Sequence, residues 1–246
     1  YTTLFRSDGF AKMISGRVEA INVLFKVDGG GWRDFDLVRN EPVTRDFYIS
    51  DLSPLWYIEY DLGFTKTLLS QHQTILESFL GGIPTSLNAT GQQWDFPNVW
   101  APMQYFMIVL YERLSVRDES NAAEYRNRAL ELAQKWINST YCGFSSFGQF
   151  FEKYHGEKVG FPGGGGEYIV QEGFGWSNAL TLWILDNYGD RMRVPEKCAH
   201  RPSVTTEGMP KLVEVVVPVM PQAPVSAGRK LLLGLQMFLM FVCASL

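Results

Sequence analysis

Three glutamates, Glu152, Glu167 and Glu172, flank a run of four consecutive glycines at residues 163–166. Such a run costs chain entropy and serves where the backbone must bend sharply or approach a ligand closely. A phosphate-binding loop is excluded, because no Gly-Lys-Ser or Gly-Lys-Thr follows the glycines. The alternative is a flexible linker, although linkers seldom carry acids and aromatic side chains on both sides. Carboxylates around a close-approach loop are the groups that acid–base hydrolysis of a glycoside requires.

A second segment, residues 91–102, has the sequence Gly-Gln-Gln-Trp-Asp-Phe-Pro-Asn-Val-Trp-Ala-Pro. Its two prolines predict a rigid loop around Trp94, Asp95 and Trp100 that leads into an apolar helix, with Pro102 near the first helical position. Indole rings suit stacking on sugars, but aromatic side chains also fill ordinary cores. From these residues alone, a packed aromatic loop is a simpler interpretation than a sugar site.

Helical periodicity identifies the elements that must position these two segments. It predicts helices over residues 11–25, 54–58, 68–80, 103–110, 122–137 and 177–187. We expect Gly81-Gly82 to close the third helix. The fourth and sixth are apolar on most faces and should be buried all round, whereas the fifth has a single apolar stripe. This mixture suits two concentric layers, as in an α/α toroid, and an ordinary helical bundle gives a similar signal. The predicted fold class is therefore all-α.

Composition limits the function classes. The 246 residues suffice for one sizeable core, and the net charge of −4 without a basic block excludes nucleic acid as a partner. His72, His155 and His200 lack the spacing of metal ligands, so we expect no metal and no cofactor. A bridge between Cys142 and Cys198 is possible, but the sequence does not establish it.

Two features indicate processing and origin. The triplets Asn88-Ala89-Thr90 and Asn138-Ser139-Thr140 permit N-glycosylation if the chain enters the secretory pathway. The first residues contain neither an initiator methionine nor a signal segment, so we expect the chain to be the later part of a longer protein.

The amino-acid composition changes in the C-terminal region. Residues 193–228 are rich in proline and are predicted to be a linker, and residues 229–246 form a hydrophobic tail. The sixteen mostly apolar residues 231–246 within it would span about 24 Å as a helix, short of the ~30 Å hydrocarbon core. The small triplet Ser226-Ala227-Gly228 before the tail favours a GPI-attachment signal, with a short membrane anchor as the alternative. We therefore expect a secreted or cell-surface protein tethered to the membrane.

Taken together, these segments resemble the trehalase family. Residues 93–102 are similar to one trehalase signature, and residues 162–168 with 171–178 are similar to another, in the same order along the chain. The resemblance extends from Gly9 to Gly189. It implies that residues 1–192 are the C-terminal portion of an (α/α)6 barrel that hydrolyses α,α-trehalose to two glucose molecules with inversion.

The resemblance also implies residue roles. Glu152, in a Glu-Lys-Tyr motif, matches the family's general base. Glu167, which closes the glycine run, matches a residue that lines the substrate pocket, and Trp94 matches the signature tryptophan near the sugar. One position departs from the pattern, because His155 stands where family members commonly have Asp.

The partner acid is missing from this pattern. In trehalases it is an Asp in a Ser-Gly-Trp-Asp motif, and neither that motif nor the arginine-rich signature occurs in this chain. Asp34, Asp36 and Asp95 do not lie in a matching motif. We therefore expect the 246 residues to be inactive alone, since a base without an acid leaves the leaving group unprotonated. The alternative is a non-catalytic sugar-binding or membrane-tethered surface protein.

Overall fold

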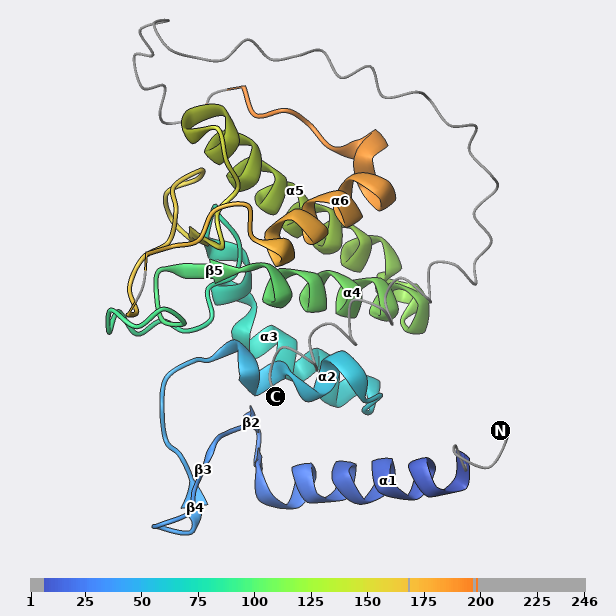
Figure 1. Ribbon diagram of the computed structural model, residues 1–246. Coiled ribbons are helices and arrows are strands. Elements are labelled where there is room, and N and C mark those ends of the chain that lie inside the picture. Colours follow the sequence, from blue (N-terminus) through green and yellow to red (C-terminus); the bar gives the residue numbers. More distant parts are fainter. Residues whose placement is uncertain (1–6, 168, 197, 199–246) are drawn as a thin grey trace, which may run out of the picture. The chain divides into compact units, whose positions relative to one another are not determined.

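The computed structural model describes residues 7–167, 169–196 and 198 (Figure 1). Almost all of the predicted linker and the whole predicted tail lie outside the described residues, so those two predictions stay open. The described residues belong to one compact unit of the chain. Within them, no helix is long and apolar enough to cross a membrane.

Helices dominate the described structure, as predicted. They are α1 (Ser7–Leu24), α2 (Pro54–Tyr57), α3 (Leu62–Ser78), α4 (Ala101–Arg117), α5 (Ala122–Phe147) and α6 (Gly175–Tyr188). Single 3-10 turns are η1 (Ile49–Leu52), η2 (Glu119–Asn121) and η3 (Gly189–Arg191). Each predicted helix is present, and most are longer than the apolar pattern that revealed them, because polar residues extend the ends.

The predicted end of α3 is wrong. The helix ends at Ser78, and Phe79 already has an extended backbone, so Gly81 and Gly82 lie beyond the helix. Gly82 has a φ of 122°, and a Cβ there would lie 2.8 Å from Gln104 Oε1. The buried Gln104 side chain donates to the carbonyl oxygen of Ile83 and accepts from its N–H, both at 2.8 Å. The glycine therefore makes room for a clamp between α4 and this loop.

The strands are short antiparallel pairs. β1 (Lys26–Val27) pairs with β2 (Gly31–Trp32), β3 (Phe35–Asp36) with β4 (Glu41–Pro42), and β5 (Asn98–Trp100) with β6 (Lys153–His155). The first two pairs are local hairpins. The third joins segments far apart in sequence, and it is the pair that builds the candidate site.

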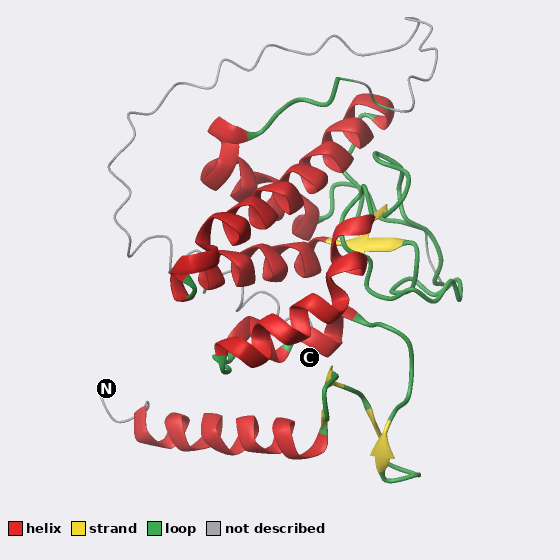
Figure 2. Ribbon diagram, turned by 180° about the vertical axis from the view of Figure 1, so that it is seen from behind, coloured by secondary structure: helices red, strands yellow, loops and turns green. Residues whose placement is uncertain are grey.

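The core is organised around α4, which packs against α2 on one side and against α5 and α6 on the other (Figures 1 and 2). Met107, Ile108 and Leu114 of α4 have no exposed surface. The expectation that this helix is buried is confirmed. Burial of large aliphatic side chains contributes roughly 1.5–3 kcal/mol each.

The amphipathic character of α5 is also confirmed. Its apolar stripe, which includes Ala133 and Trp136, is buried, and Trp136 Nε1 donates to Thr181 Oγ1 of α6 at 3.1 Å. Near the end of α5, Cys142 forms a disulfide bond with Cys198, with a Cα–Cα distance of 5.3 Å. The pairing that the sequence left open is thus present in the structure.

A buried charge network anchors the N-terminal hairpins. Asp51, which is fully buried, lies 2.6 Å from Arg33 Nη1 and 2.9 Å from Arg45 Nη2. Burial raises the pKa of the Asp51 carboxyl, and the two guanidiniums oppose that shift. Loss of either arginine would leave the carboxylate less compensated.

The prediction that α6 is buried all round is wrong for the part of the chain that the structure describes. Leu182 and Leu185 are 68% and 48% exposed, although α6 is apolar on most faces. On α1, Met13 and Ile14 are likewise more than half exposed. The covered faces of α6 are those that meet α4 and α5.

Candidate active site

The pairing of β5 with β6 brings together the two motif segments, which are residues 91–102 and residues 151–178. Trp100 lies opposite Lys153, and Asn98 lies opposite His155. The aromatic segment 91–102 therefore runs directly beside the strand that follows Glu152. A pairing of this kind is invisible to local sequence patterns, because its partners are distant along the chain.

The backbone of Glu152 is fixed on two sides. Its N–H donates to the carbonyl oxygen of Gln171 at 2.8 Å, and its own carbonyl oxygen accepts from Ser177 Oγ at 3.2 Å. Only 3% of Glu152 is exposed. The residue is thus held between β6 and the start of α6, which limits the positions that its carboxylate can take.

Lys153 is the charged neighbour of that carboxylate. Its Nζ lies 4.0 Å from Glu152 Oε2 and 5.1 Å from the centroid of the Trp100 ring. It also donates to the carbonyl oxygen of Gly165 at 3.4 Å. Burial lowers the pKa of Lys153, and the Glu152 carboxylate opposes that shift. The ammonium therefore links the carboxylate, the tryptophan and the glycine run.

The glycine run is an ordered loop rather than a flexible linker. Asn98 Nδ2 donates to the carbonyl oxygen of Gly164 at 2.8 Å, and Asn98 Oδ1 accepts from its N–H at 2.9 Å. Gly166 N–H donates to the carbonyl oxygen of Gly91 at 2.9 Å. Gly165 has a φ of 79°, and a Cβ there would lie 2.2 Å from that same oxygen. The close approach that the glycines permit is therefore to the chain's own aromatic loop.

Three indole rings lie beside this loop. Trp94 stacks on Trp100 with centroids 4.1 Å apart and an interplanar angle of 14°, and Trp176 lies 6.0 Å from Trp100. Trp100 is 2% exposed and Trp94 is 37% exposed. Trp100 belongs to the packed loop that the residues alone favour, while Trp94 keeps a face that a sugar ring could stack on.

The structure places the other predicted residues less directly. Glu167 is exposed immediately after the glycines, so its contact with substrate stays a prediction. Asp95 accepts from Ser86 Oγ at 2.8 Å and also from the Thr90 hydroxyl, and Asp34 pairs with Arg45 at 3.0 Å. These two aspartates therefore have structural partners, and the expectation that neither supplies the acid stays a prediction.

His155 has a structural role that explains its place in the Glu-Lys-Tyr-His sequence. Its Nδ1 accepts the N–H groups of Glu157 at 3.1 Å and Lys158 at 3.3 Å. Burial and the Lys158 charge lower the pKa of His155, which favours the neutral ring that can accept. A carboxylate would accept the same two bonds, so the departure from Asp keeps the turn.

Asn98, Lys153 and Trp176 have roles in the site that the sequence alone did not indicate. All three lie inside the motif segments, so their position was the available signal. Their roles depend on which segments meet, because Asn98 contacts the glycine run and Lys153 lies over Trp100 only once β5 has paired with β6.

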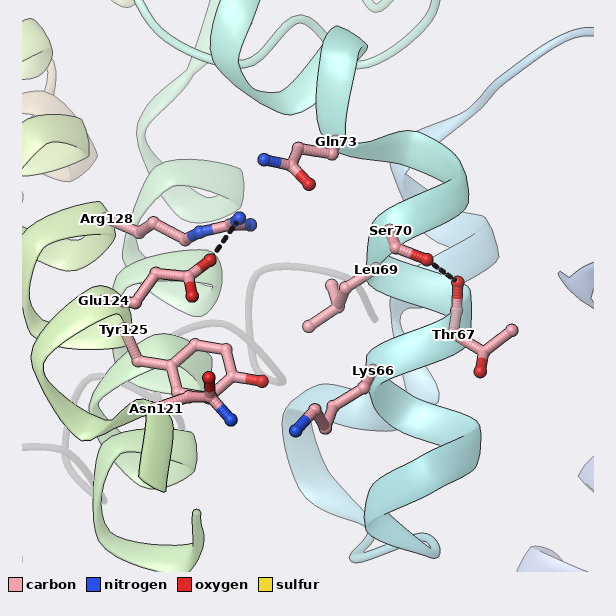
Figure 3. Close-up of a pocket in the computed structure, with 9 residues that line it drawn as sticks. All are labelled: Lys66, Thr67, Leu69, Ser70, Gln73, Asn121, Glu124, Tyr125 and Arg128. Atoms are coloured by element: carbon pink, nitrogen blue, oxygen red, sulfur yellow. Dashed lines mark hydrogen bonds and ion pairs between the residues drawn. The ribbon is translucent and has the colours of Figure 1, made fainter. Parts of the chain in front are cut away.

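A separate cavity of about 290 Å³ lies between α3 and the start of α5 (Figure 3). None of its lining residues belongs to either motif segment. Its charges pair locally, since Arg128 Nη2 lies 2.7 Å from Glu124 Oε1 and Lys66 Nζ lies 2.9 Å from Asp118 Oδ2. Among the described residues, no cluster of His, Cys, Asp or Glu could hold a metal ion.

Comparisons with known proteins agree with the motifs. The Trehalase family model matches residues 4–189. A trehalase from Homo sapiens is 42% identical over 188 residues, which cover 75% of this chain and 31% of that protein. A trehalase from Bombyx mori is 39% identical over 171 residues, covering 68% of this chain and 28% of that protein.

The fold has a solved counterpart. The neutral trehalase of Saccharomyces cerevisiae superimposes with a TM-score of 0.52 at 23% identity, covering 72% of this chain and 30% of the yeast chain. This likeness agrees with the predicted partial (α/α)6 barrel. The chain spans about three tenths of the length of these relatives. On the family match and these identities, the chain belongs to the trehalase family.

Proposed function

We propose that this chain takes part in the hydrolysis of α,α-trehalose to two glucose molecules, with Glu152 as the general base. The observation that carries the proposal is the pairing of β5 with β6, which sets the buried and doubly anchored Glu152 beside the tryptophan loop. A carboxylate held in place can act as the general base of an inverting glycosidase, and the indole face beside it can stack on the sugar ring.

The reaction follows from the role of the base. Glu152, as a carboxylate, takes a proton from one water molecule, whose oxygen attacks the anomeric carbon from the face opposite the leaving group. The bond from that carbon to the glycosidic oxygen breaks, and an acid donates a proton to the oxygen. The products are one glucose with inverted and one with retained anomeric configuration.

The neighbouring residues orient substrate and base in this proposal. Trp94 offers its exposed face to a glucose ring, and Glu167 accepts hydrogen bonds from sugar hydroxyls. Lys153, 4.0 Å from Glu152, restrains the carboxylate without touching substrate. The acid comes from outside these 246 residues, since the Ser-Gly-Trp-Asp motif is not among them. The 246 residues alone therefore bind the sugar weakly and do not cleave it.

The test uses the protein made from its complete coding sequence, with Glu152→Gln and Glu172→Gln as a matched pair. Glutamine keeps the size of Glu152 but takes no proton, so kcat should fall by about 10²–10⁴-fold. Glu172 is an exposed carboxylate in the same segment, and its variant should keep normal turnover. Normal turnover in Glu152→Gln would refute the assignment of the base.

A second readout tests the stereochemistry. Proton NMR of the initial products should show equal amounts of the α and β anomers of glucose before mutarotation. Initial release of the α anomer alone would contradict inversion. Binding of trehalose with no glucose release by the wild-type protein would favour the non-catalytic sugar-binding alternative.

We further propose that the protein passes through the secretory pathway. The bond between Cys142 and Cys198 supports this, because stable disulfides form in oxidising compartments. The tethering proposal rests on the composition of residues 229–246 alone. Release of the protein from intact cells by a phosphoinositide-specific phospholipase would support a GPI anchor, and resistance would contradict it.

A further inference from the structure

The two glycosylation triplets occupy very different places in the fold. We infer that Asn88 carries an N-linked glycan and that Asn138 does not. The inference is argued from the surroundings of each triplet; it rests on the proposed passage through the secretory pathway and not on the proposed catalytic activity.

Asn88 is half-buried in a loop that is otherwise exposed and irregular. Leu87, Ala89 and Thr90 are all exposed, and none of the residues from 87 to 91 belongs to a helix or strand. The backbone of Asn88 is nevertheless ordered, because its carbonyl oxygen accepts the N–H of Phe96 at 3.1 Å. A glycan linked here would leave the loop toward solvent from a defined position.

The side chain of Asn88 can carry the sugar without losing its fold contacts. Its Nδ2 makes one long hydrogen bond, 3.4 Å, to the hydroxyl of Tyr48. Attachment replaces one of the two amide hydrogens, so one hydrogen is left for Tyr48. The hydroxyl of Thr90, which the transfer reaction requires, is exposed, and its partners are local: it donates to Asp95 and accepts the N–H of Gln92 at 3.2 Å.

The transfer uses a lipid-linked oligosaccharide pyrophosphate as the donor of the glycan. Nδ2 of Asn88 attacks the first anomeric carbon of the oligosaccharide, and the bond from that carbon to the pyrophosphate oxygen breaks. One amide proton is lost, and the lipid pyrophosphate leaves. Secreted proteins meet this donor in the same oxidising compartment in which the Cys142–Cys198 bond forms.

Asn138 is half-buried, as Asn88 is, but the rest of its triplet has the opposite surroundings. It lies within α5, and the two residues that complete its triplet, Ser139 and Thr140, are 0% and 1% exposed. The Thr140 hydroxyl donates to the carbonyl oxygen of Trp136 at 3.1 Å, and the Ser139 hydroxyl donates to that of Gly81 at 3.3 Å. The hydroxyl of this triplet is thus part of the core.

A glycan at Asn138 would also disturb a contact that ties two segments together. Asn138 Oδ1 accepts from Gln134 Nε2 at 2.7 Å. Gln134 in turn exchanges two hydrogen bonds with the backbone of Arg193, both at 2.8 Å. A bulky polar group on Asn138 would crowd this contact. We therefore expect the chains that fold with this contact intact to lack a glycan at Asn138.

The glycan at Asn88 would stand on the loop that holds the site. Three residues further along the chain, the Gly91 carbonyl oxygen accepts the N–H of Gly166 in the glycine run. A sugar chain here would shield an exposed loop from proteases, which cut preferentially at exposed loop tips.

The experiment expresses the complete coding sequence in eukaryotic cells and maps the purified protein by peptide mass spectrometry. Peptide-N-glycosidase treatment in heavy-oxygen water converts each glycosylated Asn to a labelled Asp. We expect the label at Asn88 in most molecules and at Asn138 in none. An unlabelled Asn88, or a labelled Asn138, would overturn the inference, and so would a protein that never acquires a glycan.

Four variants give an independent readout by gel mobility. Asn88→Gln and Thr90→Ala should remove the enzyme-sensitive mobility shift, whereas Asn138→Gln should keep it. Thr90→Ser preserves both a hydroxyl for the transfer and the bond to Asp95, so it should also keep the shift. Loss of the shift in Thr90→Ser together with retention in Asn88→Gln would contradict the assignment of the site.

Discussion

Asn98 and Gly164 exchange two hydrogen bonds, one in each direction, at 2.8 and 2.9 Å. Asn98 is 1% exposed and begins β5, and Gly164 lies in the middle of the glycine run. The side chain of Asn98 therefore holds the glycine run, which precedes Glu167, against β5. The first prediction follows from this clamp.

Asn98→Ala should loosen the glycine run. The two bonds to Gly164 are lost, each with a net contribution of about 0.5–1.5 kcal/mol, together with a longer one of 3.4 Å to the Gln92 carbonyl oxygen, so the free energy of unfolding should fall by roughly 1–3 kcal/mol. Urea unfolding measures the loss, and limited proteolysis should show new cleavage within residues 162–167. Asn98→Asp keeps the acceptor and loses the donor, so it should be destabilised as well. An unchanged midpoint and no new cleavage in Asn98→Ala would contradict the clamp.

Two adjacent glycines should differ sharply in their tolerance of alanine. A Cβ on Gly163 would lie 2.3 Å from Asn98 Oδ1 and 2.8 Å from Lys153 Cγ, whereas one on Gly164 meets nothing within 4 Å. Gly163→Ala should therefore be destabilised by about 1–3 kcal/mol through overpacking. Gly164→Ala should be neutral or stabilised by up to ~1 kcal/mol, because its backbone does not need a positive φ. Thermal unfolding compares the pair, and equal stabilities would refute the packing argument.

Removal of the disulfide should destabilise the fold. Cys142 and Cys198 are separated by 56 positions, and closing a loop of that length is worth about 4 kcal/mol in the chain-entropy model. The double variant Cys142→Ala with Cys198→Ala should lose about this amount in urea unfolding. Dithiothreitol should destabilise the wild-type protein and leave the double variant unchanged. Indifference of the wild-type protein to the reductant would show that the bond does not form.

Stability should depend on the protonation of His155. Because its folded pKa is lowered, the unfolded state binds more protons between that value and the ordinary value near 6.5. The contribution is thus fully present above about pH 6.5 and is lost as the pH falls through the folded pKa. The free energy of unfolding should decline as the pH falls below about 6.5.

Two variants separate His155 from other titrating groups. The pKa of His72 is also lowered by burial, so the wild-type pH profile contains both residues. His155→Asp keeps an acceptor for the N–H groups of Glu157 and Lys158 and does not titrate in this range, so its decline should be shallower. His155→Ala should lose stability at every pH. A pH profile of His155→Asp equal to that of the wild-type protein would contradict the role of the imidazole.

The sequence alone was sufficient wherever the signal was local. The helices were predictable because each carries its own apolar period, and the buried character of α4 was predictable because it is apolar on most faces. The end of α3 was not predictable, because Gly82 makes room for the side chain of Gln104 and Gly81 makes room for the backbone of His155 and Gly156, and neither glycine caps the helix. The motifs around Glu152 and Trp94 identified the family from residue types and order.

Tertiary structure decided which of these residues meet. The chain pairs β5 with β6, and only that pairing sets Lys153 over Trp100 and Asn98 against Gly164. It also determined the partner of Cys142, and it left Thr90 exposed while burying the hydroxyls beside Asn138. Contacts between distant segments depend on how all the helices pack at once. A local pattern contains the propensity of each segment and not the identity of its neighbour.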